Sequence, residues 1–326
     1  MADIRVIEAP PPPVSWARVH EPDAPPLRIG VVQHAWSPES LTDWLHAAVD
    51  AAAEHGARIV FLPELTLSRY PADSLPEGLA VDGAEELESG PTVVFAREAA
   101  RRNNVHVHVS LYRRADAQDG LGLNTAIIVA PSGDIVAVTN KLHIPVTAGY
   151  YEDKYFRAGP AGPDDPYRVH DVLGARIGLP TCWDEWFPEV ARAYALGGAD
   201  ILVYPTAIGS EPDHPDFDTQ PLWQQVIVGN GIANGLFMVV PNRTGAETRP
   251  DRSPGNTFYG SSFVSDPYGR VLVQAPRDEP CVLVADLDLA QRTDWLDLFP
   301  FLRTRRPDTY GPLVVPVDPE RPYGGS

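Results

Sequence analysis

The chain has little cysteine and no long apolar run, and each absence narrows the class of protein. Only two of its 326 residues are cysteines, Cys182 and Cys281, and they lie far apart in the sequence. A disulfide-rich secreted domain or a cysteine-based metal site needs several cysteines at close spacing. No apolar stretch approaches the roughly 20 residues that cross a bilayer, and the N-terminus has no leader pattern. We therefore expect a cytoplasmic protein without a membrane partner.

Positive charge is also scarce. The sequence holds 26 Lys and Arg against 44 Asp and Glu, which gives a formal net charge of −18 at pH 7. A surface of this sign repels phosphate backbones and anionic lipids. We expect no nucleic-acid partner and a mild tolerance for cationic ligands.

What the chain does contain is a series of apolar runs of strand length with helical patterns between them. Residues 27–33, 57–62 and 105–112 predict strands, and residues 40–55 and 91–103 predict amphipathic helices. Later strands are joined by short turns, which departs from a strict alternation of strand and helix. The pattern favours an α/β fold in which two mixed sheets stack face to face with helices outside.

Proline-rich segments border one central domain. Residues 1–26 contain a run of four prolines and cannot pair as a central strand, so we expect an extended arm. Residues 27–302 contain no polar or low-complexity linker and predict a single domain. Residues 303–326 are interpreted as an extension that packs on another surface, at a subunit interface.

The stretch from residue 175 to 189 (ARIGLPTCWDEWFPE) is the strongest candidate for a reactive site. An apolar strand run ends at Pro180, and a helix start follows at Pro188 and Glu189. Cys182 therefore lies at a strand-to-helix turn, where unpaired N–H groups and a helix dipole favour the thiolate. A lone cysteine after a strand is more often a small buried hydrophobe, so the assignment depends on partners.

Two charged side chains follow other predicted strands. Glu64 comes just after residues 57–62, and Lys141 comes shortly after another predicted strand. Each alone is most often a surface charge, but strand ends are where α/β folds assemble their sites. With Cys182 they supply what acyl transfer from an amide-like carbon needs: a nucleophile, a proton shuttle and a cation for the oxyanion. The backbone N–H of Trp183 is the expected second oxyanion donor.

Several segments carry a family resemblance. Its main motifs are residues 61–65 (FLPEL), 140–145 (NKLHIP) and 181–189 (TCWDEWFPE). They resemble the glutamate, lysine and cysteine motifs of the nitrilase, or carbon–nitrogen hydrolase, superfamily, in the same order and at similar spacing. Residues 204–212 (YPTAIGSEP) and 257–263 (TFYGSSF) most resemble its N-carbamoylputrescine amidase branch.

The resemblance implies a four-layer α-β-β-α sandwich, no metal or organic cofactor, and homo-oligomers built on a dimer. It implies hydrolysis of an N-carbamoyl amine through an S-acyl enzyme, with release of amine, ammonia and carbon dioxide. It also implies a fourth catalytic residue, Glu152, which would orient Lys141 or the attacking group. Two departures from the family pattern are Asn140, where relatives often have arginine, and Pro180.

Candidate substrate-binding residues lie around the nucleophile. They are Tyr150, Asp184, Glu185, Trp186, Glu211 and Phe258. The aromatic residues would wall a slot for a methylene chain, and Glu211 would bind a distal ammonium. Relatives that act on N-carbamoyl-α-amino acids place arginine near Glu185, so acids there would repel an α-carboxylate. Asp184 and Glu185 equally fit helix capping, facing away from substrate.

Two other functions remain open on the sequence alone. One is an enzyme with a different small substrate, either N-carbamoyl-β-alanine or an ω-amide. The other is a catalytically silent scaffold of the same fold, which the presence of Glu64, Lys141 and Cys182 together disfavours.

Overall fold

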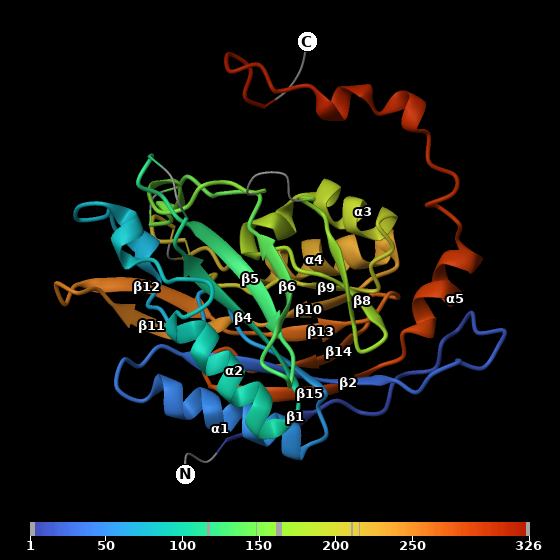
Figure 1. Cartoon of the computed structure of the whole chain (residues 1–326). Helices are drawn as coiled ribbons and strands as arrows, with labels where there is room; N and C mark the ends of the chain where they lie inside the picture. The colour runs from blue at the N-terminus through green and yellow to red at the C-terminus, as the bar shows by residue number, and fades with distance from the viewer. Residues whose placement is uncertain are drawn as a thin grey trace.

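The computed structural model describes residues 4–115, 118–147, 149–160, 165–209, 211–214 and 216–323. Two β-sheets lie face to face, and helices cover their outer faces (Figure 1). Helices α1 (Leu41–Glu54) and α2 (Pro91–Asn103) pack on the first sheet, and α3 (Pro188–Leu196) and α4 (Gln220–Asn234) pack on the second. The predicted α-β-β-α sandwich is confirmed.

The first sheet is mixed. Its main path runs β1 (Val6–Glu8), β15 (Cys281–Leu287), β2 (Leu27–Ala35), β3 (Ile59–Phe61), β4 (His106–Arg113), β5 (Leu123–Val129) and β6 (Ile135–Asn140). The hairpin of β11 (Arg243–Thr248) and β12 (Pro254–Tyr259) joins it beside β2. Strands β2, β3 and β4 are parallel, whereas β4, β5 and β6 are antiparallel.

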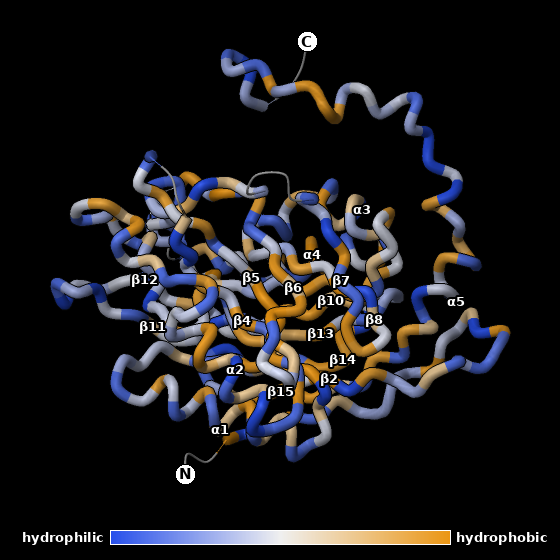
Figure 2. The backbone as a smooth tube through the Cα atoms, in the orientation of Figure 1, coloured by the Kyte–Doolittle hydropathy of each residue, from blue (hydrophilic) through white to orange (hydrophobic). Residues whose placement is uncertain are grey.

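The second sheet is smaller. Its order is β14 (Val271–Gln274), β13 (Phe263–Ser265), β10 (Phe237–Val240), β9 (Ile201–Val203), β8 (Ala175–Gly178) and β7 (Val169–Val172). The inner faces of the two sheets form a shared core that contains Ile29, Phe61, Ile177 and Val203. Central strands buried on both faces need apolar residues throughout, which explains their continuous apolar runs. Figure 2 shows this apolar interior.

The N-terminal arm lies along the first sheet. Strand β1 pairs in parallel with β15, so Ile7 lies opposite Leu283 at an edge that tolerates neighbouring prolines. Farther along, the Arg18 guanidinium donates to Asp288 (2.7 Å) and Asp294 (2.9 Å). The arm is therefore held by backbone pairing and ion pairs.

The C-terminal segment leaves the sandwich after α5 (Ala290–Leu298) and arches away from it (Figure 1). Four apolar side chains in this segment are exposed: Leu313, Val314, Val315 and Val317. Among the described residues, none of the helices combines the length and the apolar character required to cross a lipid bilayer.

Candidate active site

Cys182 lies at a sharp turn between strand β8 and the helical residues that follow it. Strand β8 ends at Gly178, and Cys182 opens a short 3₁₀ helix, Cys182–Trp186 (η4), before α3 begins at Pro188. The φ angle of Cys182 is +43°, in the left-handed region that side chains other than glycine avoid. Its N–H donates to the carbonyl of Pro205, two residues after the end of β9 (3.1 Å). Such strain persists where the surroundings hold it, and it is common at functional sites.

Three charged side chains from separate elements meet beside this turn. Glu64 follows β3, Lys141 follows β6, and Glu152 begins the short 3₁₀ helix Glu152–Lys154; all three are buried. The Lys141 ammonium donates to Glu64 Oε1 (2.9 Å) and to Glu152 Oε2 (2.6 Å). The structure thus brings together the residues that the sequence assigned to chemistry.

Further polar residues that the sequence did not reveal hold the two carboxylates. Asn124 on β5 donates to Glu64 Oε1 (2.7 Å), and the Ala207 N–H donates to Glu64 Oε2 (3.0 Å). The Tyr70 hydroxyl donates to Glu152 Oε1 (2.8 Å). Each oxygen of both glutamates therefore accepts a hydrogen bond from a fixed donor.

The buried Arg243 supports the backbone beneath Glu64. Its guanidinium donates to the Glu64 carbonyl (2.9 Å) and to the Leu65 carbonyl (2.6 Å). Glu247 balances its charge across 2.6 Å. An asparagine inside an apolar strand run was the signal that could have identified Asn124, but nothing local in the sequence marks Arg243.

Burial and mutual charge set the protonation states here. Burial alone would lower the pKa of Lys141, but Glu152 and Glu64 outweigh it and hold that pKa well above its usual value. Burial raises the pKa of Glu152 to about 7, against the attraction of Lys141. Burial and then the negative charge of Glu64 raise the pKa of the Cys182 thiol well above its usual value. The resting site therefore holds an ammonium beside a protonated thiol.

The expectation that the turn favours a thiolate is wrong. Cys182 itself opens the five-residue 3₁₀ helix η4, and α3 begins six positions later, so Cys182 lies outside the first turn of α3. A macrodipole effect is confined to the first turn of a helix. The thiol must instead lose its proton to a nearby base as it attacks.

A small hollow opens onto the thiol. It is lined by Pro145, Thr147, Tyr150, Glu152, Cys182, Trp183, Ala207, Ile208 and Glu211. It leaves about 410 Å³ of empty space, part of which is open to solvent. In the described part of the chain the Trp183 N–H has no hydrogen-bond acceptor, so it can donate to a ligand.

The substrate-binding candidates divide between this wall and the protein interior. Tyr150 and Glu211 line the hollow. Phe258 instead packs behind it, with its ring 5.9 Å from that of Tyr70. The Trp186 ring lies 6.3 Å from that of Trp183 and is not part of the wall.

The structure does not place Asp184 or Glu185 in the wall of the hollow. Asp184 is buried and accepts hydrogen bonds from Thr181 and His143. Glu185 is also buried, and neither carboxyl oxygen has a partner among the described residues. Burial and then the negative charge of Glu64 raise the pKa of this carboxyl well above the usual value, which favours its protonated form. The direct substrate role expected for these two acids has no support in the geometry.

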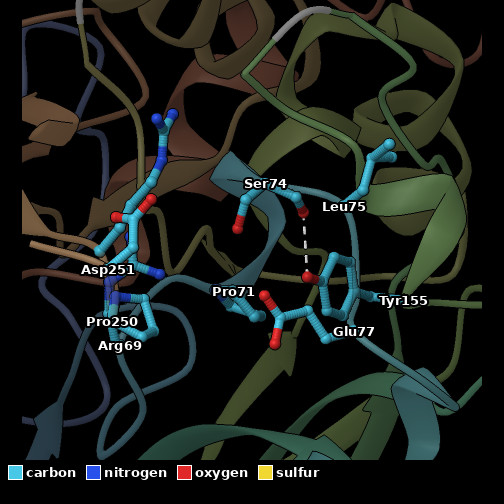
Figure 3. Close-up of a pocket in the computed structure, with 9 residues that line it drawn as sticks. Arg69, Pro71, Ser74, Leu75, Glu77, Tyr155, Pro250 and Asp251 are labelled. Atoms are coloured by element: carbon cyan, nitrogen blue, oxygen red, sulfur yellow. Dashed lines mark hydrogen bonds between the residues drawn. The ribbon is translucent and has the colours of Figure 1, made fainter. Parts of the chain in front are cut away.

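A second, larger hollow is bordered by none of the four proposed catalytic residues (Figure 3). It leaves about 880 Å³ of empty space and is bordered by Arg69, Pro71, Ser74, Leu75, Glu77, Tyr155, Arg249, Pro250 and Asp251. The Tyr155 hydroxyl donates to the Ser74 carbonyl across one side (2.9 Å; Figure 3). Arg69 and Arg249 both contact the buried Asp73, whose single negative charge offsets one of the two positive charges. No cysteine or lysine is among the described residues that border this hollow.

Within the described ranges, no group of three or more His, Cys, Asp or Glu side chains is arranged to hold a metal ion. Cys281 is buried in β15, and burial raises the pKa of its thiol to about 11. It is a core residue.

Comparison with known proteins agrees with this geometry. The carbon-nitrogen hydrolase family matches residues 28–296. A citrullinase from Francisella tularensis is 35% identical over 291 residues, covering 88% of this chain and 98% of that protein. An N-carbamoylputrescine amidase from Solanum lycopersicum is 36% identical over 270 residues, covering 82% and 87%.

Solved structures share the fold. A carbon-nitrogen hydrolase from Helicobacter pylori G27 superposes with a TM-score of 0.79 at 33% identity, covering 89% of this chain and 98% of that one. A mutant amidase of the nitrilase superfamily from Nesterenkonia AN1 superposes with a TM-score of 0.69 at 23% identity, covering 90% and 99%.

Proposed function

Because the chain belongs to the carbon–nitrogen hydrolase family and is a hydrolase of non-peptide C–N bonds, we propose that it cleaves an N-carbamoyl amine through an S-acyl enzyme. The observation that carries this proposal is the Lys141 ammonium, held between Glu64 and Glu152 beside the hollow that Cys182 lines. We assign it to the cytoplasm, where the thiol stays reduced.

The first step is attack by sulfur. Glu64 takes the proton of the Cys182 thiol, and the sulfur adds to the carbamoyl carbon. The carbonyl oxygen gains the electron pair and accepts hydrogen bonds from Lys141 and from the Trp183 N–H. Two observations support this order of events: the raised pKa of the thiol, and a Trp183 N–H that has no acceptor in the described ranges.

The next steps release the nitrogen-containing leaving group and then the acyl group. The tetrahedral species collapses as Glu64 returns the proton to the leaving nitrogen, which breaks the C–N bond and leaves an S-acyl enzyme. Water then gives a proton to Glu64 and adds to the acyl carbon, and Glu64 reprotonates the sulfur as it departs. Hydrolysis of the S-acyl enzyme releases a carbamic acid, whose remaining C–N bond breaks without the enzyme to give carbon dioxide and the second nitrogen compound. An N-carbamoyl amine therefore yields the amine, ammonia and carbon dioxide.

Charge in the hollow favours an amine at the far end of the substrate. Its described wall holds two carboxyl groups, Glu152 and Glu211, and no lysine or arginine. An ammonium beside Glu211 gains attraction, whereas a carboxylate meets repulsion. An N-carbamoylputrescine-like substrate therefore fits better than N-carbamoyl-β-alanine or an ω-amide, both of which end in a carboxylate.

Citrulline is the second candidate, because the relative named citrullinase is 35% identical and is covered over 98% of its length. Citrulline carries a carboxylate beside its amine, so the same wall would attract one group and repel the other.

A substrate panel tests the proposal. Purified enzyme is given N-carbamoylputrescine, citrulline, N-carbamoyl-β-alanine and an ω-amide, and ammonia and free amine are measured. We expect the highest kcat/KM with N-carbamoylputrescine, and a loss of at least about 10³-fold in Cys182→Ala. A preference for citrulline would overturn the substrate assignment, and ordinary turnover in Cys182→Ala would overturn the mechanism.

The proposal extends to assembly. We expect a homo-oligomer built on a dimer, in which residues 303–323 pack against another subunit. The support is the exposed apolar group of Leu313, Val314, Val315 and Val317 on a segment that leaves its own sandwich.

A further inference from the structure

Asp184 is a buried carboxylate on which two active-site segments converge. It is 0% exposed. From its own turn it accepts the Thr181 N–H at Oδ2 (3.0 Å). From the segment after Lys141 it accepts the His143 N–H (2.9 Å) and pairs with His143 Nδ1 (2.7 Å), both at Oδ1, with the Leu142 N–H 3.4 Å from Oδ2. A carboxylate suits this position because it has only acceptors to offer.

On the nucleophile side, Asp184 closes a loop around the reacting groups. The Thr181 N–H donates to its side chain, and its own N–H donates back to the Thr181 carbonyl (3.1 Å). Between these two residues lie Cys182, with its left-handed backbone, and Trp183, whose N–H has no acceptor among the described residues. The loop therefore fixes the direction of the Trp183 N–H.

On the lysine side, Asp184 fixes the backbone that presents the ammonium. Leu142 and His143 directly follow Lys141, so their hydrogen bonds to Asp184 set where the Lys141 chain begins. The His143 imidazole also stacks on Phe187, with ring centroids 3.8 Å apart at 14°. Phe187 directly follows η4, so the histidine contacts both the middle of η4 and the residue after it.

We propose that Asp184 is a positioning residue, which sets the Trp183 N–H and the Lys141 ammonium at the spacing that receives the developing oxyanion. The inference rests on the proposed function and adds a residue that touches neither substrate nor the reacting atoms. Replacing Asp184 should weaken stabilisation of the transition state and leave substrate binding unchanged, because Asp184 is not part of the wall that holds the substrate.

Asp184→Asn is the first test, because it keeps the size of the side chain. It replaces one acceptor oxygen by an N–H₂ group, which cannot accept a hydrogen bond from Thr181 or His143. We expect kcat to fall by about 100-fold or more, as for the loss of one oxyanion donor, while KM stays within about threefold. Alkylation of Cys182 by iodoacetamide, a displacement that needs no oxyanion site, stays within about threefold of wild type.

His143 supplies a milder second test that does not threaten the fold. His143→Ala removes the Nδ1 hydrogen bond, and we expect kcat to fall about tenfold with KM unchanged. His143→Asn places an amide N–H₂ near the position of Nδ1 and should restore kcat to within about threefold. A circular-dichroism melt of each variant shows whether it is folded at the assay temperature.

The outcomes separate cleanly. A KM that rises as far as kcat falls in Asp184→Asn would place Asp184 in substrate binding and overturn the inference. So would unchanged kcat, or an alkylation rate that falls together with kcat. If Asp184→Asn does not fold, a failure of His143→Asn to restore kcat overturns it. If wild type prefers another ureide or amide, kcat and KM are measured with that compound. The test of Asp184 therefore holds even if the proposed substrate is wrong.

Discussion

Glu152 sets the acid side of the pH profile in our proposal. Burial raises its pKa to about 7, so its carboxyl is protonated below that pH and ionised above it. The ionised form holds the Lys141 ammonium in place, so kcat/KM should fall as the pH drops below about 7. In Glu152→Gln we expect kcat to fall about 10- to 100-fold at alkaline pH and the bend near pH 7 to disappear. A bend that persists in this variant would assign the titration to another group.

Glu185 should make the fold less stable as the pH rises. Its folded-state pKa is raised, so the folded chain keeps a proton that the unfolded chain releases above the usual glutamate pKa. Stability is therefore lost from about pH 4.5 upward, through the folded pKa. Glu185→Gln removes this penalty. We expect its Tm to exceed that of wild type by a few degrees near pH 8 and the difference to shrink toward pH 4.5. A difference that does not change with pH would contradict this account.

Single residues differed in how far the sequence could place them. Glu64, Lys141 and Cys182 follow strand runs and could be proposed from that position, whereas their convergence depends on the three-dimensional fold. Glu152 came only from a family resemblance, because its local sequence is that of a surface loop. On the sequence, Asp184 fitted substrate binding and helix capping equally well. Its hydrogen bond to His143 reaches 41 positions back along the chain, and sequence spacing does not reveal such a contact.

At the scale of elements, the turn between β8 and η4 carries measurable strain. Cys182 has a φ of +43°, a region that costs a non-glycine residue about 1–2 kcal/mol. We therefore expect Cys182→Gly to be more stable than Cys182→Ala by about 1 kcal/mol, the reverse of the usual order. Urea unfolding of the two inactive variants measures this difference. Equal stabilities, or a more stable alanine variant, would show that the turn relaxes when the sulfur is removed.

Elements with strong periodic patterns were predictable, and short ones were not. Helix α2 lies at 91–103 as predicted, because an apolar face and Pro91 at its start define it locally. The 3₁₀ helix η4 was missed, because five residues carry no period. Strand β1 was missed because its three residues gain stability only from pairing with β15, more than 270 positions later.

At the scale of the whole molecule, the C-terminal segment is the feature that a single chain leaves unexplained. Val314 is 85% exposed, and its apolar neighbours Leu313 and Val317 are 64% and 59% exposed. An apolar group of this kind is typical of a surface covered by a partner. Deletion of residues 303–326 should leave the sandwich folded and lower the molar mass measured by light scattering after size-exclusion chromatography. Val314→Asp should weaken the same assembly, whereas Glu320→Gln on the same segment is a control that should not. An unchanged molar mass after the deletion would show that assembly uses another surface.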